Sequence, residues 1–315
     1  MTAELGPDTT TDEVVAHVNL AGKTAVITGA SAGLGAETAR ALAKAGARVV
    51  MAVRDLAKGE QAASAIRSAH PHAALEVRQL ELAELESVRA FALGWTGPIH
   101  VLVNNAGLMG AEQGYTVDGF ELHFGTNHLG HFLLTALLVP YLIAGEPSRV
   151  INLSSRGHHA AHVDFDDPNF RTRPYDKLRA YGQSKTANVL FTVELDRRLR
   201  DRGVRAFAVH PGVVLTELGR HLSTDDIANM GKSLRGASSP QPSLKSVTAG
   251  AATGVWAATA PELAGRGGVY LEDCRQSDET VPGWRGAMPY ATDPQVAEQL
   301  WAVSEHLVGQ TFPLT

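Results

Sequence analysis

The stretch Tyr181-Gly182-Gln183-Ser184-Lys185 places a phenol and an ammonium group four residues apart. The surrounding sequence has a helical pattern, so both side chains should lie on one face of a helix. A free phenol with a pKa of about 10 is a poor base at neutral pH, but a neighbouring cation stabilises the phenolate and lowers that pKa. The pair therefore predicts a group that exchanges a proton near pH 7. A solvated helix face could carry the same residues, so the rest of the chain must decide whether the pair has a catalytic role.

A second stretch with chemical potential is a glycine-rich turn. Ala25-Val26-Ile27-Thr28 leads into Gly29-Ala30-Ser31-Ala32-Gly33-Leu34-Gly35, and a helical pattern follows. Glycines permit a tight turn and a close approach of the backbone to a pyrophosphate, whose charge is favoured at a helix N-terminus. A glycine trio often marks only a turn, but its position between the first strand and the first helix predicts dinucleotide binding. The glycine spacing is G-x-x-x-G-x-G and not G-x-G-x-x-G, which narrows the subtype of dinucleotide-binding motif.

The end of the second predicted strand indicates which nucleotide is preferred. An acidic residue there would bind the 2′-hydroxyl of the adenosine ribose, whereas an arginine accommodates a 2′-phosphate. The strand ends Ala52-Val53-Arg54-Asp55, so Arg54 favours NADP(H) over NAD(H). Asp55 is explained as the cap of the next helix. Arg54 could instead form a surface ion pair.

Secondary-structure elements must bring these motifs together. From Lys23 onward, short β-rich runs alternate with long Ala- and Leu-rich stretches. The predicted strands are Thr24–Thr28, Arg48–Val53, Leu75–Leu80, His100–Asn104, Arg149–Leu153, Val204–Val209 and Gly268–Leu271. The predicted helices are Gly35–Lys44, Leu56–Ser68, Leu85–Leu93, Gly119–Ile143, Leu178–Asp201 and Lys245–Thr259. This alternation predicts an α/β fold, a Rossmann-type doubly wound seven-stranded parallel sheet with helices on both faces, in a single domain.

The remaining segments flank this domain or connect its late elements. Residues 1–19 are predicted to form a tail and a short helix that is capped around Thr11 and ends at Val18, before a catalytic domain over residues 20–315. Asp293–Leu307 is predicted to be a closing helix. The long connections at residues 156–179 and 217–245 follow late strands and are predicted to be substrate-side loops, although they could be simple insertions.

Composition excludes several classes of protein. The net charge of −5 argues against a general nucleic-acid or anionic-membrane surface. The single cysteine, Cys274, excludes an internal disulfide and favours a reducing cytoplasm. No stretch is expected to supply the roughly 20 apolar residues of a membrane-spanning helix, and the first 20 residues lack the pattern of a signal peptide. We therefore expect a cytoplasmic protein without membrane insertion.

Together the motifs resemble those of the short-chain dehydrogenase/reductase family. The shared motifs are Thr28-Gly29-x-x-x-Gly33-x-Gly35, Asn104-Asn105-Ala106-Gly107, the Asn127 segment, Ser154-Ser155, Tyr181-x-x-x-Lys185 and Pro211-Gly212. The segments Asn127-His128-Leu129-Gly130-His131-Phe132 and Ser155-Arg156-Gly157-His158-His159 are similar to the retinol-dehydrogenase-like branch. The spacing of 26 residues from Ser155 to Tyr181 also fits that branch.

The resemblance implies a catalytic group of Asn127, Ser155, Tyr181 and Lys185. Ser155 would hydrogen-bond to the substrate oxygen, where negative charge develops, and Tyr181 would pass the proton. Lys185 would lower the pKa of Tyr181 and hold the nicotinamide ribose, while Asn127 would position a water molecule that links Lys185 to solvent. Ser154 is instead expected to form a hydrogen bond with a backbone group.

The resemblance also implies further cofactor contacts. Asn105-Ala106-Gly107 would lie by the adenosine ribose, and His210-Pro211-Gly212-Val213-Val214-Leu215-Thr216 would surround the nicotinamide. In Leu80-Glu81-Leu82, Glu81 stands where the family usually has an aspartate beside the adenine. The extra methylene puts that contact in question. The nicotinamide carries the hydride, and the protein orients the reactants and polarises the reacting group.

The histidines and the cysteine do not form a recognisable ligand set. His128, His131, His158, His159 and His162 could suggest a metal, but no cysteine or carboxylate pattern completes a site, so none is predicted. His158 and His159 could border the substrate, or their hydrogen bonds could simply be satisfied within the loop. Cys274 has no positioned base and is expected to be structural.

The sequence thus predicts an NADP(H)-dependent oxidoreductase that interconverts an alcohol and a carbonyl group. The second loop contains apolar residues that suit a lipophilic substrate or simply pack the loop: Leu218, Leu222, Ile227, Met230 and Leu234. Two alternatives remain open, a reductase of small or carrier-bound β-keto substrates and a nucleotide-sensing protein without turnover. The resemblance further implies a homodimer or homotetramer that pairs through Gly119–Ile143 and Leu178–Asp201.

Overall fold

The central element of the molecule is one twisted sheet. The computed structural model describes residues 5–220, 222–223, 226, 243–277, 280–281 and 285–313. Within these residues the sheet has eight strands in the order β10-β9-β6-β5-β4-β1-β2-β3. They are β1 (Thr24–Thr28), β2 (Arg48–Val53), β3 (Leu75–Gln79), β4 (Val101–Asn104), β5 (Ser148–Leu153), β6 (Val204–His210), β9 (Val269–Glu272) and β10 (Arg275–Gln276).

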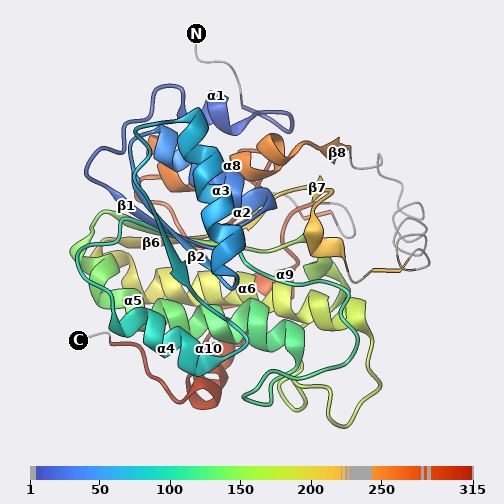
Figure 1. Cartoon of the computed structure of the whole chain (residues 1–315). Helices are drawn as coiled ribbons and strands as arrows, with labels where there is room; N and C mark the ends of the chain where they lie inside the picture. Colours follow the sequence, from blue (N-terminus) through green and yellow to red (C-terminus); the bar gives the residue numbers. More distant parts are fainter. Residues whose placement is uncertain are drawn as a thin grey trace.

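Helices cover both faces of this sheet (Figure 1). The face that carries the N-terminal segment is covered by α1 (Thr11–Val15), α2 (Gly33–Lys44), α3 (Leu56–Ala69) and α8 (Val247–Thr259). The opposite face is covered by α4 (Leu85–Leu93), α5 (Gly130–Ala144), α6 (Lys177–Leu199) and α10 (Pro294–Val308). The sheet therefore separates two apolar cores, and its inner strands are buried on both sides.

Short elements connect the main ones. They are the π-helix η1 (Phe124–Leu129), the 3-10 helices η2 (Arg156–Ala160), η3 (Arg200–Arg202), η4 (Glu217–Gly219) and η5 (Pro261–Leu263), helix α9 (Pro289–Thr292), and the strand pair β7 (Val213–Val214) and β8 (Leu244–Lys245). Several of them lie at the carboxyl ends of the main strands. That edge is where ligands bind in open α/β sheets.

The inner strands show why the apolar runs of the sequence form a parallel sheet. In β2 every residue from Val49 to Val53 is buried, and β2 pairs in parallel with both β1 and β3. Continuous apolar runs that are rich in valine suit strands that are covered on both faces. The chain then crosses from β3 at one edge to β4 on the other side of β1. This reversal opens a crevice beyond the carboxyl ends of β1 and β4.

The fold class is confirmed, with local corrections at element ends. An additional strand, β10, pairs antiparallel with β9 after a tight turn in which Asp273 and Cys274 both have positive φ. The helix expected from Gly119 begins later, because Tyr115 and Glu121 first form an isolated β-bridge. The helix expected from Lys245 begins at Val247, because Lys245 belongs to β8.

The N-terminal helix and the loops also differ from the prediction in detail. Thr10 caps α1, which ends at Val15 and not at Val18. The first long connection is shortened by η2 at one end and by α6, which starts at Lys177, at the other. In the second loop, Leu218 and Leu222 are described, whereas Ile227, Met230 and Leu234 lie outside the described residues.

The face of α5 and α6 that was expected to pair between subunits is covered by the chain itself. Helix α10 packs along α6, and its Trp301 ring lies 5.2 Å from Phe132 of α5 and 5.9 Å from Phe191 of α6. Phe312 closes over Trp301, with ring centroids 4.2 Å apart. Pairing of subunits through the remaining surface of α5 and α6 stays a prediction.

One helix in the described residues is long and apolar enough to span a membrane. It runs over Phe124–Ala144, through η1 and α5, and 72% of its apolar stretch is buried inside the molecule. The expectation that no stretch would reach this length was therefore wrong. The helix is apolar because it lies between the sheet on one side and α4, α6 and α10 on the other.

Candidate active site

Helix α6 carries Tyr181 and Lys185, and both side chains point into the molecule. Asp176 caps this helix by accepting hydrogen bonds from the backbone N–H groups of Leu178 and Arg179. Tyr181 is 5% exposed and Lys185 is 4% exposed. The Lys185 Nζ atom lies 5.7 Å from the Tyr181 ring centroid and donates to the Leu153 carbonyl at 3.0 Å. The ammonium group is thereby held at the carboxyl end of β5.

Ser155 follows β5 directly and faces Tyr181. Its hydroxyl oxygen accepts the Gly157 N–H at 3.0 Å, and its side chain hydrogen-bonds to Tyr181. A Cβ atom at Gly157 would lie 2.8 Å from Cε1 of Tyr181, so only glycine permits this close packing. Ser154 donates instead to the Lys185 carbonyl at 2.9 Å, as expected of a residue that satisfies the backbone.

Burial controls the protonation of the pair on α6. It raises the pKa of Tyr181 to about 12, against the opposing effect of the Ser155 hydrogen bond. It lowers the pKa of Lys185 to about 8. Burial dominates the pKa of Tyr181 in this structure, and the Lys185 ammonium group donates to the Leu153 carbonyl, so the lowering of the Tyr181 pKa by Lys185 stays a prediction. Tyr181 is a phenol at neutral pH and can donate its proton.

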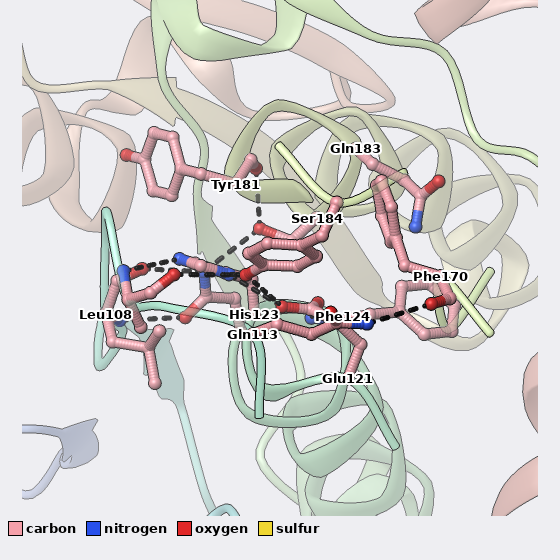
Figure 2. Close-up of polar contacts among 12 residues, drawn as sticks. Leu108, Gln113, Glu121, His123, Phe124, Phe170, Tyr181, Gln183 and Ser184 are labelled. Carbon is pink, nitrogen blue, oxygen red and sulfur yellow. Dashed lines mark hydrogen bonds and ion pairs between the residues drawn. The ribbon is translucent and has the colours of Figure 1, made fainter. Parts of the chain in front are cut away.

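Asn127 lies in η1, and its side chain hydrogen-bonds to Leu108 and Ser184, two residues of the network in Figure 2. Its Oδ1 accepts the Leu108 N–H at 2.9 Å, and its Nδ2 donates to the Leu108 carbonyl at 3.0 Å. Nδ2 also lies 3.0 Å from the Ser184 hydroxyl, which donates to the Tyr181 carbonyl at 2.7 Å. The structure thus brings Asn127 to the helix that carries Tyr181 and Lys185. Its predicted link to solvent through a water molecule stays a prediction.

His131 and Thr28 form a contact that the sequence did not reveal. Nδ1 of His131 donates to the Asn127 carbonyl at 3.0 Å, and Nε2 lies 2.8 Å from the Thr28 hydroxyl. Burial lowers the pKa of His131 to about 4, so the ring is neutral and Nε2 accepts from Thr28. The Thr28 oxygen in turn accepts the N–H groups of Asn105 and Ala106, each at 2.9 Å. The η1 segment is thereby connected to the glycine turn.

His158 supports Ser155 through the backbone. Nδ1 of His158 donates to the Ser155 carbonyl at 2.6 Å, and Nε2 accepts the Met288 N–H at 3.1 Å. Burial lowers its pKa to about 3. His159 donates to the Gly286 carbonyl, and Nε2 of His128 lies 2.8 Å from the Ser304 hydroxyl. In the described part of the chain no group of three or more His, Cys, Asp or Glu side chains could hold a metal.

The glycine turn forms a backbone cradle at the start of α2. Gly29 has a φ of +67°, which glycine adopts at no steric cost. A Cβ atom at Gly35 would lie 2.3 Å from the Gly29 carbonyl oxygen, and one at Gly29 would lie 2.9 Å from Cα of Ala106. These positions leave no space for a side chain. The N–H groups that open α2 have no side-chain cap, which leaves them available to an anion.

A cavity of about 350 Å³ lies over this cradle. It is lined by most of the predicted cofactor residues, namely Gly29, Ser31, Gly33, Leu34, Gly35, Arg54, Glu81, Leu82, Asn105, Ala106, Gly107 and Thr216. The sequence missed further lining residues, namely Thr28, Ala32, Ala52, Asp55, Lys58, Leu80, Leu108, Thr126, Glu217, Leu218 and Arg220. Thr28, Lys58 and Thr126 are immediate neighbours of predicted motifs, so proximity in the chain was the available signal.

Some predicted cofactor residues lie away from this cavity. Val214 faces α8, because a Cβ atom at Gly250 would lie 2.4 Å from Cγ2 of Val214 and 3.6 Å from the Pro211 carbonyl oxygen. Gly212, with a φ of +85°, packs on the Lys245 side chain. Tyr181 and Lys185 lie beyond Gly107, where a Cβ atom would be 3.7 Å from Lys185 Nζ. The contacts of Pro211, Gly212 and Val214 with a nicotinamide stay predictions.

Arg54 lies at the rim of the cavity. Its side chain is 71% exposed, and its Nε lies 3.7 Å from the Glu81 carboxylate. Glu81 also accepts the Ala83 N–H at 2.9 Å, which fixes its carboxylate in the turn after β3. Asp55 accepts the Lys58 N–H at 3.1 Å and so caps α3, as predicted. Two cations, Arg54 and Lys58, thus face the same end of the cavity.

The residues present fit a nicotinamide dinucleotide. The uncapped start of α2 and the glycine cradle suit a pyrophosphate, and the two cations at the rim suit a further phosphate. Leu80 and Leu82 offer apolar contact for a base. Thr126 adds a buried hydroxyl that has no hydrogen-bond partner among the described residues. Such a group is expected to find one in a bound ligand.

Comparisons with known proteins agree with this geometry. A family model described as short chain dehydrogenase matches residues 23–227. Human retinol dehydrogenase 13 is 44% identical over 299 residues, which cover 93% of this chain and 86% of that protein. Human retinol dehydrogenase 12 is 44% identical over 296 residues, which cover 93% of this chain and 88% of that protein.

Solved structures show the same fold. A crystal structure of an uncharacterised protein from Mycobacterium paratuberculosis is 40% identical, with a TM-score of 0.75, and the match covers 95% of this chain and 98% of that chain. A structure from Beutenbergia cavernae, described as an NAD(P)-dependent gluconate 5-dehydrogenase with bound NADP, is 25% identical with a TM-score of 0.65. That match covers 80% of this chain and 95% of the other.

Proposed function

Because the chain belongs to the short-chain dehydrogenase family, we propose that it interconverts an alcohol and an aldehyde or ketone with NADP(H), using Tyr181 as acid and base. Family membership makes it an oxidoreductase that acts on CH–OH groups. The observation that carries the residue roles is the convergence of Ser155 and Lys185 on a buried Tyr181, beyond a cavity built on the glycine turn.

The proposed roles follow from the hydrogen bonds of each side chain. The Ser155 oxygen accepts the Gly157 N–H, and its O–H, which lies against the Tyr181 hydroxyl, is placed to turn to the substrate oxygen, where negative charge develops. In reduction the Tyr181 phenol donates its proton to that oxygen and becomes a phenolate, and in oxidation the phenolate form accepts the proton of the alcohol. A bound nicotinamide supplies or accepts the hydride. Lys185, held by the Leu153 carbonyl, is placed to hold the cofactor ribose.

The preference for NADP(H) rests on the cations at the cavity rim. Arg54 follows β2, where the adenosine ribose of a dinucleotide is expected, and Lys58 lines the same end. The Glu81 carboxylate, 3.7 Å from Arg54, competes for the same cation and weakens the preference. The result is a preference for the 2′-phosphate of NADP(H) over the 2′-hydroxyl of NAD(H).

A cofactor titration tests this preference. NADPH and NADH are titrated against the wild type and Arg54→Glu, with fluorescence of the bound nicotinamide as the readout. We expect NADPH to bind at least about tenfold more tightly than NADH to the wild type, and Arg54→Glu to reverse that order, because the new carboxylate repels the phosphate and accepts a 2′-hydroxyl. Arg48→Glu, on a surface residue at the other end of β2, is the control. Equal or tighter NADH binding by the wild type would overturn the preference.

The substrate class proposed is lipophilic. The two human relatives are named retinol dehydrogenases, and Leu218 and Leu222 bring apolar side chains to the loop beside the cavity. A panel of aliphatic aldehydes from butanal to dodecanal, together with ketones and β-keto esters, is to be assayed with NADPH. We expect kcat/KM to rise with chain length, since each buried methylene contributes about 0.8 kcal/mol. Faster turnover of small β-keto esters would contradict a lipophilic pocket.

A further inference from the structure

A buried pair of Glu121 and His123 lies next to Tyr181 through the His123 ring, and the proposed mechanism gives the pair no role. The side chains of Glu121 and His123 are both 0% exposed. The His123 ring stands edge-on to the Tyr181 ring, with centroids 6.1 Å apart and planes at 72°. Figure 2 shows Glu121 and His123 in one polar network beside the helix that carries Tyr181. A buried charge requires converging donors, so its partners indicate what it holds in place.

Three donors converge on Glu121. Its Oε1 accepts Nδ1–H of His123 at 2.7 Å and the Tyr175 hydroxyl at 3.1 Å, and its Oε2 accepts the Phe124 N–H at 2.8 Å. Burial and the charge of Glu121 raise the pKa of Tyr175, so this phenol keeps its proton and acts as a donor. With the proton of His123 on Nδ1, its Nε2 is left as an acceptor.

Nε2 of His123 and the hydroxyl of Tyr175 both contact the backbone of one residue, Ala111. His123 Nε2 accepts the Ala111 N–H at 3.3 Å, and the Tyr175 hydroxyl lies 3.1 Å from the Ala111 carbonyl oxygen. Three residues earlier, Asn127 binds the N–H and the carbonyl of Leu108. Both ends of the Leu108–Ala111 segment are therefore fixed by side chains, one end by a residue of the predicted catalytic group.

The Leu108–Ala111 segment leads from the cofactor cavity toward the substrate loops. Leu108 lines the cavity. Gly110, with a φ of +71°, lies against Leu222 of the second loop, where a Cβ atom would be 2.3 Å from Cδ2 of Leu222. Tyr175, from the first loop, lies on Ala111. The segment is thus a wall that both loops contact, and His123 lies between it and the ring of Tyr181.

Resting on the proposed function, we propose that Glu121, His123 and Tyr175 are positioning residues for the reaction. They fix the Leu108–Ala111 wall at the distance from Tyr181 that directs a substrate carbonyl toward the phenol. The cluster transfers no proton to the substrate, and its effect is geometric. A displacement of the reacting group by about 1 Å can reduce the rate by about 100-fold.

Two substitutions of His123 separate the contact with the wall from the contact with Glu121. The amide of His123→Gln reaches the position of Nε2 and can still accept the Ala111 N–H. The amide of His123→Asn reaches the position of Nδ1 and keeps only the bond to Glu121. We expect His123→Asn to lose about tenfold or more in kcat/KM for the fastest aldehyde of the panel, and His123→Gln to stay within about threefold of wild type.

Tyr175→Phe is a milder variant that keeps the ring and removes the hydroxyl. It should also lose about tenfold in kcat/KM, while the Kd of NADPH and the pH at which kcat changes match those of the wild type. Tyr141→Phe is the matched control, because Tyr141 lies on α5 near Ile99, at the opposite ends of the strands.

The outcomes are distinguishable. A wild-type enzyme that reduces no carbonyl with NADPH would refute the proposed function itself. An active wild type whose His123→Asn and Tyr175→Phe variants stay within about twofold would overturn the positioning role. The positioning role would also be overturned if the losses in kcat/KM correlated with lower melting temperatures of the variants and not with loss of the Ala111 contact. The cluster would then contribute only to stability.

Discussion

Gly157 illustrates how tightly the site is packed around Tyr181. A methyl group at this position would lie 2.8 Å from the phenol ring, and one at Gly182, next to Tyr181, would lie 2.6 Å from the Gly157 carbonyl oxygen. The turn after Ser155 and the helix that carries Tyr181 therefore approach each other through two glycines. The position of the phenol is set by backbone contact as well as by side chains.

Lys185 gives the site a dependence on pH. Burial lowers its pKa to about 8, so Lys185 is charged below that pH and neutral above it. A neutral amine holds a cofactor ribose less well, so we expect kcat/KM for NADPH to be constant between pH 6.5 and about 7.5 and to fall above about pH 8. Tyr181, with a pKa of about 12, does not titrate in this range.

The pH profile of the free enzyme measures this effect. Lys185→Met should be slower at every pH and should show no inflection near pH 8, because the titrating group is gone. A wild-type profile that stays flat to pH 10 would show that the charge of Lys185 does not matter for cofactor binding.

The sequence identified residues whose chemistry is local and missed those whose chemistry depends on distant partners. Tyr181 and Lys185 share one helix, so spacing alone predicts that they meet. Glu121 and Tyr175 are 54 residues apart, and only folding brings the phenol to the carboxylate. The contact of Lys185 Nζ with the Leu153 carbonyl was missed for the same reason, since Leu153 lies on another element.

At the level of elements, strands that are buried on both faces were predicted most accurately. The bounds of β1 and β2 match the prediction, because apolar runs bordered by polar residues mark them clearly. β10 has two residues, which is too short to leave a hydrophobic pattern. The π-helix η1 was also unpredictable, because a π-helical turn keeps the apolar composition of the α-helix around it.

Helix α10 should contribute strongly to stability through Trp301. Trp301 contacts Phe132, Phe191 and Phe312, and the Arg198 guanidinium lies 4.6 Å from its ring centroid. We expect Trp301→Ala to lower the free energy of unfolding by about 3 to 5 kcal/mol in urea titrations. NADPH binding, at the carboxyl edge of the sheet, should persist wherever the variant is folded.

A milder substitution of the same residue serves as the control. The indole Nε1 of Trp301 is buried and has no hydrogen-bond partner among the described residues, so Trp301→Phe loses no such bond and should cost less than about 1.5 kcal/mol. If Trp301→Ala and Trp301→Phe were equally stable, α10 would not be packed as described.

At the level of the whole molecule, the two cores are unequal in polarity. The core around α5, α6 and α10 contains neutral, buried histidines, and burial lowers the pKa of His128 to about 3 and that of His131 to about 4. His158, beside Ser155, has a pKa lowered to about 3. Unfolding would expose all three rings and return their pKa to about 6.5.

This difference predicts a loss of stability in mild acid. Below pH 6.5 the unfolded chain binds protons at these histidines while the folded protein does not, so the free energy of unfolding falls as the pH falls from about 6.5 toward 4. Between pH 7 and pH 5.5 we expect a loss of about 1 kcal/mol per histidine, roughly 3 kcal/mol in total. Urea titrations at the two pH values measure it. Equal stability at both would mean that the rings are protonated in the folded protein.

At the same scale, the homodimer or homotetramer that the family resemblance implies stays a prediction. The sequence marks α5 and α6 as long apolar helices, which suits either a subunit interface or a buried layer. The aromatic contacts of Trp301 and Phe312 show that α10 covers this face within one chain. Sequence patterns identify an apolar face, but they do not identify its partner.

Replacement of Tyr181 by phenylalanine tests the central claim most directly. Tyr181→Phe keeps the ring that packs on Gly157 and removes only the hydroxyl that exchanges the proton. We expect NADPH to bind with a Kd within about twofold of wild type while kcat for aldehyde reduction falls by about 100-fold or more. A variant that binds NADPH and retains wild-type kcat would contradict the assignment of Tyr181 as the acid and base.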